Sequence, residues 1–135
     1  MSERHIINPP GLAKPRGFNH GIVCTGGRLL LLAGQDASDA NGVICAPGDL
    51  PAQYEQVVKN LQAVVKAASG TLADIVKLNI FVTDRDAYRA QLKQLGAIHR
   101  AYFGQHYPTM ALLEVKGLFQ PDALIEMEGI AHLQD

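Results

Sequence analysis

Pro108-Thr109-Met110-Ala111-Leu112-Leu113-Glu114-Val115 and Leu124-Ile125-Glu126-Met127-Glu128-Gly129-Ile130-Ala131 are the two segments that decide the fold of this chain. Both alternate with the period of two that is typical of β-strands. Side chains two residues apart on a strand point to the same face, about 7 Å from each other. Glu126 and Glu128 therefore share a face with Leu124 and Ile130. Because two carboxylates on an apolar face need water or partners, we expect a wet pocket at a packed interface.

The composition is that of one globular domain spanning residues 1–135. The chain is 47 % hydrophobic and 19 % charged, with a formal net charge of −1. The low charged fraction predicts that some surface is buried in an assembly, and the charge balance gives no attraction to nucleic acid or an anionic membrane. Met1–His5 begins no apolar signal, and Cys24 and Cys45 lack a CxxC partner, so we expect reduced thiols in a cytoplasmic protein. The histidine spacing predicts no metal site, and no organic cofactor is expected.

The N-terminal third contains an arm and two strands. Residues 1–19 are rich in proline and glycine and are expected to form an irregular arm. Two apolar runs, Gly21–Cys24 and Arg28–Ala33, flank the pair Gly26-Gly27. A Gly-Gly turn between apolar runs is typical of a β-hairpin, so the two runs are predicted to pair with each other.

Two amphipathic helices are predicted downstream. The first carries an apolar stripe from Tyr54 to Ala68, with Asp49 as its N-cap, Pro51 in its first turn and Gly70 at its C-terminal cap. The second runs from about Arg85 to Phe103 and carries two stripes. Its apolar stripe includes His99, which we expect in the core, and its basic stripe (Arg89, Lys93 and Arg100) is typical of a solvated face.

A strand over residues 75–82 separates the two helices, so the predicted order is hairpin, helix, strand, helix, strand, strand. This order favours an α+β fold in which two helices cover one face of a mixed sheet. The uncovered face is expected to carry four large apolar side chains: Met110, Leu112, Leu124 and Ile130. Because this is too much apolar surface for water, we expect a closed symmetric oligomer.

In this order and spacing, several segments resemble the Rid family of reactive intermediate (enamine/imine) deaminases, also called the YjgF family, some of whose members are labelled L-PSP endoribonucleases or translation inhibitors. The matching segments are Leu32-Ala33-Gly34-Gln35, the helix from Tyr54 to Gly70, Asp74-Ile75-Val76-Lys77, Phe81-Val82-Thr83-Asp84 and the two terminal strands. The resemblance implies a chorismate-mutase-like α+β fold. It also implies a homotrimer whose sheets form an inner barrel, with three clefts between subunits.

The resemblance also locates the clefts in this sequence. Deaminating members grip the substrate carboxylate with an arginine two residues after the proline, and this position is Met110 here. A thioether has neither charge nor donor and cannot form that bidentate contact, which argues against standard 2-imino-acid deamination. Three other cleft positions are also less polar than in those members: Phe18 (a tyrosine there), Ala33 (a serine there) and Leu112.

The glutamate of the family's clefts is retained as Glu126, which is thought to position the attacking water in deaminating members. Burial favours a protonated carboxyl, which suits proton transfer. His20 is a second candidate for handling protons, and Arg16 on the arm is a candidate replacement for the missing anion clamp. Alternatively, Glu126 pairs with a cation or a backbone donor at an interface, and Phe18 and its apolar neighbours serve only packing.

Three functional classes remain open. The chain is a deaminase-like hydrolase acting on an imine or enamine without the usual clamp, or a non-catalytic module that binds a small, fairly apolar metabolite in the clefts. The third class, a ribonuclease or translation inhibitor, is the weakest. The sequence has no basic and aromatic patch and no paired histidines for that chemistry.

Overall fold

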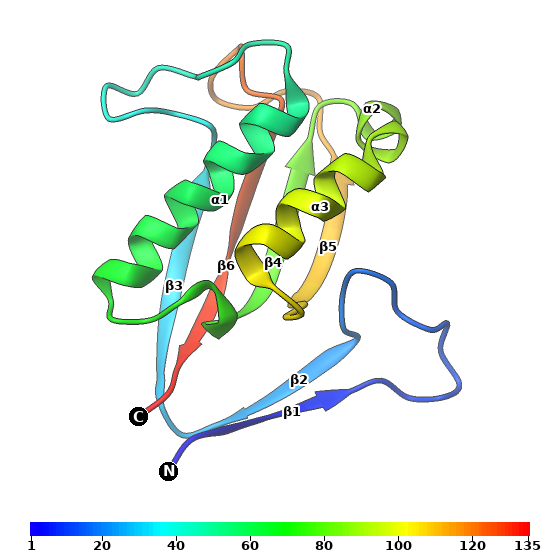
Figure 1. Cartoon of the computed structure of the whole chain (residues 1–135), viewed down its shortest axis with the longest axis vertical. Helices are drawn as coiled ribbons and strands as arrows, with labels where there is room; N and C mark the ends of the chain where they lie inside the picture. Colours follow the sequence, from blue (N-terminus) through cyan, green and yellow to red (C-terminus); the bar gives the residue numbers. More distant parts are fainter.

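A computed structural model describes all 135 residues of the chain (Figure 1). The elements in chain order are β1 (Glu3–Ile7), β2 (Gly21–Thr25), β3 (Arg28–Gln35), α1 (Leu50–Ala67), the 3-10 helix η1 (Leu72–Asp74), β4 (Ile75–Val82), α2 (Arg85–Ala90), α3 (Leu92–Phe103), β5 (Thr109–Glu114) and β6 (Ile125–Leu133). Four strands form one sheet in the order β3-β6-β4-β5, in which only β4 and β5 are parallel. The predicted α+β fold with a mixed sheet is confirmed.

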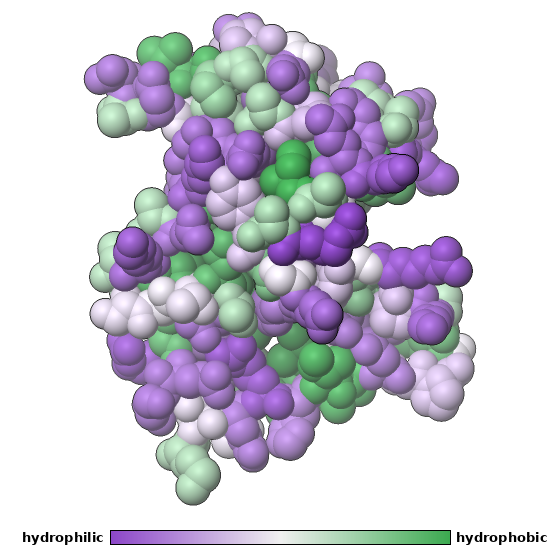
Figure 2. Space-filling view, viewed as in Figure 1, coloured by the Kyte–Doolittle hydropathy of each residue, from purple (hydrophilic) through white to green (hydrophobic).

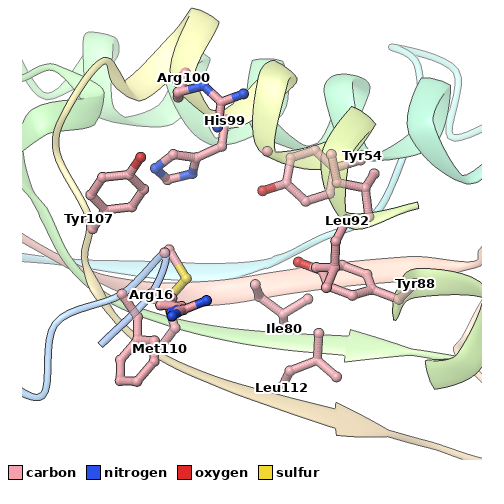
Figure 3. Close-up of a pocket in the computed structure, with 14 residues that line it drawn as sticks. Arg16, Tyr54, Ile80, Tyr88, Leu92, His99, Arg100, Tyr107, Met110 and Leu112 are labelled. Atoms are coloured by element: carbon pink, nitrogen blue, oxygen red, sulfur yellow. The ribbon is translucent and has the colours of Figure 1, made fainter. Parts of the chain in front are cut away.

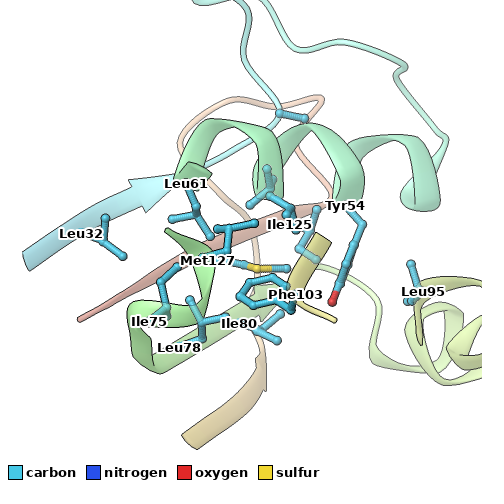
Figure 4. Packing of buried hydrophobic residues seen from close by; sticks show 14 of the residues in the cluster. Leu32, Tyr54, Leu61, Ile75, Leu78, Ile80, Leu95, Phe103, Ile125 and Met127 are labelled. Carbon is cyan, nitrogen blue, oxygen red and sulfur yellow. The ribbon is translucent and has the colours of Figure 1, made fainter. Parts of the chain in front are cut away.

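The helices lie on one face of the four-stranded sheet, as predicted (Figure 1). Figure 4 shows the core between them, where side chains of α1 meet those of β4 and β6. The predicted stripe of the first helix is buried, and so are its partners on the sheet: Tyr54, Val57, Val58, Leu61, Val65, Ile75, Leu78, Ile80, Ile125 and Met127. This burial is the main source of stability for the chain. None of the helices has the length and hydrophobicity needed to cross a lipid bilayer.

The predicted cap of α1 is confirmed at its N-terminus and wrong at its C-terminus. The Asp49 carboxylate accepts a hydrogen bond from the Ala52 backbone N–H at 3.1 Å, which confirms the predicted N-cap. The left-handed residue after the helix is Ser69, with a φ of 65°, and not Gly70. Gly70 has a packing role instead, because a Cβ there would lie 2.6 Å from Leu133 Cδ2.

The predicted second helix is two helices. Gln91 leaves helical geometry with φ −114° and ψ 17°, and it separates α2 from α3. Its side-chain amide donates to the Ala87 carbonyl at 3.1 Å, which stabilises the break. The predicted end is confirmed, because Gly104 adopts a φ of 64° directly after Phe103.

The predicted hairpin and the irregular arm are both wrong in part. The two strands around Gly26-Gly27 exist, but β2 pairs with β1 and β3 pairs with β6. Residues 1–19 therefore contain a strand, Glu3–Ile7, and only the stretch after it is irregular. The two glycines adopt positive φ values and pass between the ends of the chain, where any Cβ would overlap a carbonyl oxygen of Met1 or Leu133. They carry the chain from one sheet to the other rather than closing a hairpin.

The small sheet is attached to the main body through Arg4. Its guanidinium donates to Asp74 Oδ1 at 2.6 Å, to Gln134 Oε1 at 2.7 Å and to the Ala73 carbonyl at 2.8 Å. Hydrogen bonds to charged groups contribute more than neutral ones, and this set joins β1 to η1 and to the end of β6. The arm that follows β1 therefore starts from a fixed position.

The two faces of the sheet differ from the prediction at β5. On β6, Ile125 and Met127 face the helices, whereas Glu126 lies on the open face, as expected. Leu124 was expected on the open face, but it packs against the core beside Leu50 and Ala87. Met110 and Leu112 were also expected on the open face, together with Ile130, and this is wrong. In the β4–β5 register they pair with Leu78 and Ile80, whose side chains face the helices.

The open face remains strongly apolar without them. Leu29 and Leu31 of β3 are 67 % and 73 % exposed, and Leu113 of β5 is 45 % exposed. Ile130, paired with Leu31 across the β3–β6 ladder, adds to the same surface. Figure 2 shows the opposite, helix-bearing side, which is mainly hydrophilic. The uncovered apolar surface is thus the face of the sheet turned away from the helices.

We expect Gly129→Ala to lower the free energy of unfolding by more than about 3 kcal/mol. Gly129 lies opposite Leu78 on β4, and an added Cβ would overlap the Lys77 carbonyl oxygen. The matched control is Gly117→Ala, where no atom lies within 4 Å of the added Cβ. Urea denaturation of both variants checks this expectation, and equal stabilities would contradict the close approach of β4 and β6.

Candidate functional site

A cavity of about 480 Å³ opens between the helices, β5 and the N-terminal arm (Figure 3). This volume suits a small metabolite. Its apolar lining comes from Phe18, Ile80, Leu92, Leu95, Met110 and Leu112, and its polar lining from Arg16, Tyr54, Tyr88, His99, Arg100 and Tyr107. The cavity separates α2 and α3 from β5, so Met110 and Leu112 on the helix-facing side of that edge strand are only partly covered.

The arm is held against the start of β5 by Asn19. Its backbone N–H donates to the Pro108 carbonyl at 3.1 Å, and its side-chain amide donates to the Tyr107 carbonyl at 2.6 Å. Gly17 precedes Phe18 with a φ of 76°, a conformation that other residues adopt with strain. This turn and the Asn19 anchor bring Arg16 and Phe18 to the cavity.

His99 is buried, as predicted for a core histidine, yet it also lines the cavity. Its ring stacks between Phe103 and Tyr107, with centroid distances of 4.4 and 4.9 Å. Nε2 donates to the His106 carbonyl at 2.9 Å, so the second ring nitrogen is the acceptor in the neutral form. Burial lowers the pKa of His99, which keeps the ring neutral at physiological pH.

Two tyrosines form the inner wall, and sequence reasoning treated them only as core residues. The rings of Tyr54 and Tyr88 lie 6.5 Å apart, and Figure 3 shows both hydroxyl groups pointing into the cavity. Burial raises the pKa of Tyr54 far above its usual value and the pKa of Tyr88 to about 12. Both hydroxyls are therefore protonated and available as donors. The signal in the sequence was two tyrosines on apolar helix stripes, since a buried hydroxyl needs a partner.

Glu126 lies on the other face of the sheet, away from this cavity. Its carboxylate rests on Gly34, where an added Cβ would come within 2.6 Å of Oε2. Burial raises the pKa of Glu126, and the negative charges of Asp36 and Glu128 raise it further. Glu126 forms no salt bridge within the chain. The alternative in which Glu126 pairs with a cation is therefore not observed within one subunit.

The structure divides the candidate residues into two sets. Arg16, Phe18, Met110 and Leu112 line the cavity, whereas Glu126 lies beyond the sheet, with Ala33 exposed at the nearby end of β3. His20 packs edge-on against Phe18, with ring centroids 5.2 Å apart, but its Nε2 donates to the Ala13 carbonyl at 2.7 Å. No group of three or more histidine, cysteine or acidic side chains is placed to hold a metal ion.

The comparisons with known proteins agree with the fold. Residues 12–133 match the family described as Endoribonuclease L-PSP. The chain therefore belongs to this family, whose members are also called YjgF or Rid proteins. A RutC family protein, PH0854 from Pyrococcus horikoshii, is 31 % identical over 130 residues, covering 96 % of this chain and 98 % of the relative.

Solved structures of the same family superpose over nearly the whole chain. The Rid family protein YyfB from Yersinia pestis has a TM-score of 0.86 at 36 % identity and covers 96 % of this chain and 98 % of its own. The YjgF gene product of E. coli has a TM-score of 0.66 at 30 % identity, covering 94 % of both chains. The resemblance found in the motifs is thus confirmed at the level of the family.

Because the pKa of Glu126 is raised in the folded chain, the direction in which this residue changes stability with pH can be predicted. Above its ordinary value of 4.5, the unfolded chain releases the proton before the folded chain does. We therefore expect the free energy of unfolding to fall, relative to Glu126→Gln, as the pH rises from 4.5 toward neutrality. Urea denaturation across this range measures the difference, with the exposed Glu3→Gln as control. A relative gain in stability with rising pH would instead reveal a cation facing Glu126.

Proposed function

We propose that this protein binds a small metabolite in clefts between the subunits of a homotrimer and hydrolyses an imine or enamine there. One observation carries the proposal: the candidate residues lie on opposite faces of the sheet, in a cavity and around Glu126. No single copy can bring them to one substrate. A ring in which the open face of one copy meets the cavity side of the next joins the two sets.

The apolar open face supports the assembly. Exposed leucines on β3 and β5 would lose their contact with water between copies, and closed rings are the usual solution for such a face. The trimer itself, with the sheets forming an inner barrel, is taken from the family resemblance. A cytoplasmic location accords with two free cysteines, Cys24 and Cys45.

The chemistry needs a group that can hold and release a proton. In imine hydrolysis, water adds its oxygen to the carbon of the C=N bond, and the nitrogen receives a proton. The carbinolamine then loses ammonia as the C–N bond breaks, and a carbonyl remains. An enamine first takes a proton on carbon to become an imine. Glu126, with its pKa shifted toward neutrality, is suited to orient the water and transfer these protons.

A direct test uses imines made in the reaction mixture from apolar amino acids by an amino-acid oxidase. We expect the protein to accelerate release of ammonia and the 2-oxo acid, because a large apolar side chain on the substrate supplies binding that the missing arginine does not. Glu126→Gln should lower that acceleration at least tenfold. Glu3→Gln is the charge-matched control. If the wild-type protein binds 2-oxo acids but accelerates no imine, the non-catalytic binding module is the correct class. The ribonuclease alternative has no positive observation in its favour.

A second test asks whether Met110, in place of the arginine of other members, limits the reaction. With 2-aminoacrylate generated in place, we expect little acceleration of pyruvate release by the wild-type protein. Met110→Arg should raise the rate about tenfold or more, because hydrogen bonds between charged groups contribute about 1.5–3 kcal/mol. Met110→Leu is the control without charge. A wild-type rate equal to that of arginine-containing members would show that position 110 does not limit the reaction.

A further inference from the structure

We infer that Arg16 and Arg100 together form an anion-binding rim on the cavity, which selects organic acids with a large apolar body, such as aromatic 2-oxo and 2-imino acids. This inference rests on the proposed function, because it names the substrate class of the same cavity. The two arginines come from distant parts of the chain, the arm and α3. They reach the same opening although position 110 carries no charge.

Both guanidinium groups are free to bind a ligand. Arg16 and Arg100 are exposed at the mouth of the cavity, and neither forms a salt bridge within the chain. The Arg100 guanidinium folds back over the helix, since a Cβ added at Gly96 would lie only 3.2 Å from Nη1. The absence of a side chain at position 96, also on the cavity wall, leaves room for this conformation.

The interior of the cavity specifies the rest of the ligand. Below the rim, the walls are mainly aliphatic and aromatic, and His99 adds no positive charge because its ring is neutral. Figure 3 shows Arg16 and Arg100 on two sides of a space into which the Tyr54 and Tyr88 hydroxyls also point. A carboxylate at the rim would leave the apolar body of the ligand in contact with the inner wall.

The relative contributions of ion pairs and of apolar burial to affinity explain why a small acid is a poor ligand. Exposed ion pairs contribute little, so two rim arginines alone do not hold an anion tightly. Most of the affinity must come from apolar surface that leaves water. An acid with only a methyl group removes little apolar surface from water, whereas a phenyl group removes several times more.

Calorimetric titration of the intact protein with three probes tests this inference. Phenylpyruvate carries both the anion and the ring, pyruvate lacks the ring, and phenylacetone lacks the carboxylate. We expect phenylpyruvate to bind at least tenfold more tightly than pyruvate. Arg16→Gln and Arg100→Gln should each weaken phenylpyruvate about threefold, and the double variant about tenfold, while phenylacetone binding stays unchanged.

The matched control is Arg89→Gln, which removes the same charge from exposed α2 without touching the cavity. If phenylpyruvate and phenylacetone bind equally and the arginine variants change neither, the inference is wrong but the cavity remains a binding site. If the variants weaken both ligands alike or change the molecular mass in solution, the arginines are structural or interface residues and the inference is again wrong. If no probe binds, the proposed function fails with it.

Discussion

The incomplete coverage of the sheet by its helices determines most of the remaining structure. The helices cover one side of the sheet but do not pack closely on the edge strand β5, so a cavity remains between that strand and α2 and α3. The other side has no cover, and its leucines remain exposed beside Glu126. Two surfaces that need a partner thus lie on opposite sides of one thin sheet. One is the cavity, which we propose binds a small molecule, and the other is the apolar face, which we propose contacts a second copy.

The sequence predicted the parts of the fold that depend on local pattern. The period of β4 and β6, the stripe of α1 and its Asp49 cap are local signals, and each was confirmed. Pairing partners are not local. The Gly26-Gly27 turn satisfies hairpin chemistry, but β1 competes successfully for β2, and this strand lay within a stretch rich in proline and glycine. Long-range pairing decided the outcome, and alternation within each strand cannot reveal it.

The candidate site was predictable only in part, for a related reason. Alternation places Met110 and Leu112 on one face of a strand, but which face is covered depends on the parallel register with β4. Motif resemblance identified Phe18 and Glu126, and the missing clamp suggested Arg16, but neither argument separated them in space. Arg100 and the two tyrosines were missed because a basic stripe and an apolar stripe are usually a solvated face and a core. Their role in the lining follows from how the three helices are placed against β4 and β5, which is tertiary information.

The division of the candidate residues across the sheet has a genetic consequence if the clefts are shared between copies. A subunit with a blocked cavity still offers an intact Glu126, and a subunit lacking Glu126 still offers an intact cavity. Mixed rings of two defective variants would then contain some complete sites, so two inactive alleles could complement each other in one cell. Dilution below the dissociation constant of the assembly would remove every site at once, including those of wild-type subunits.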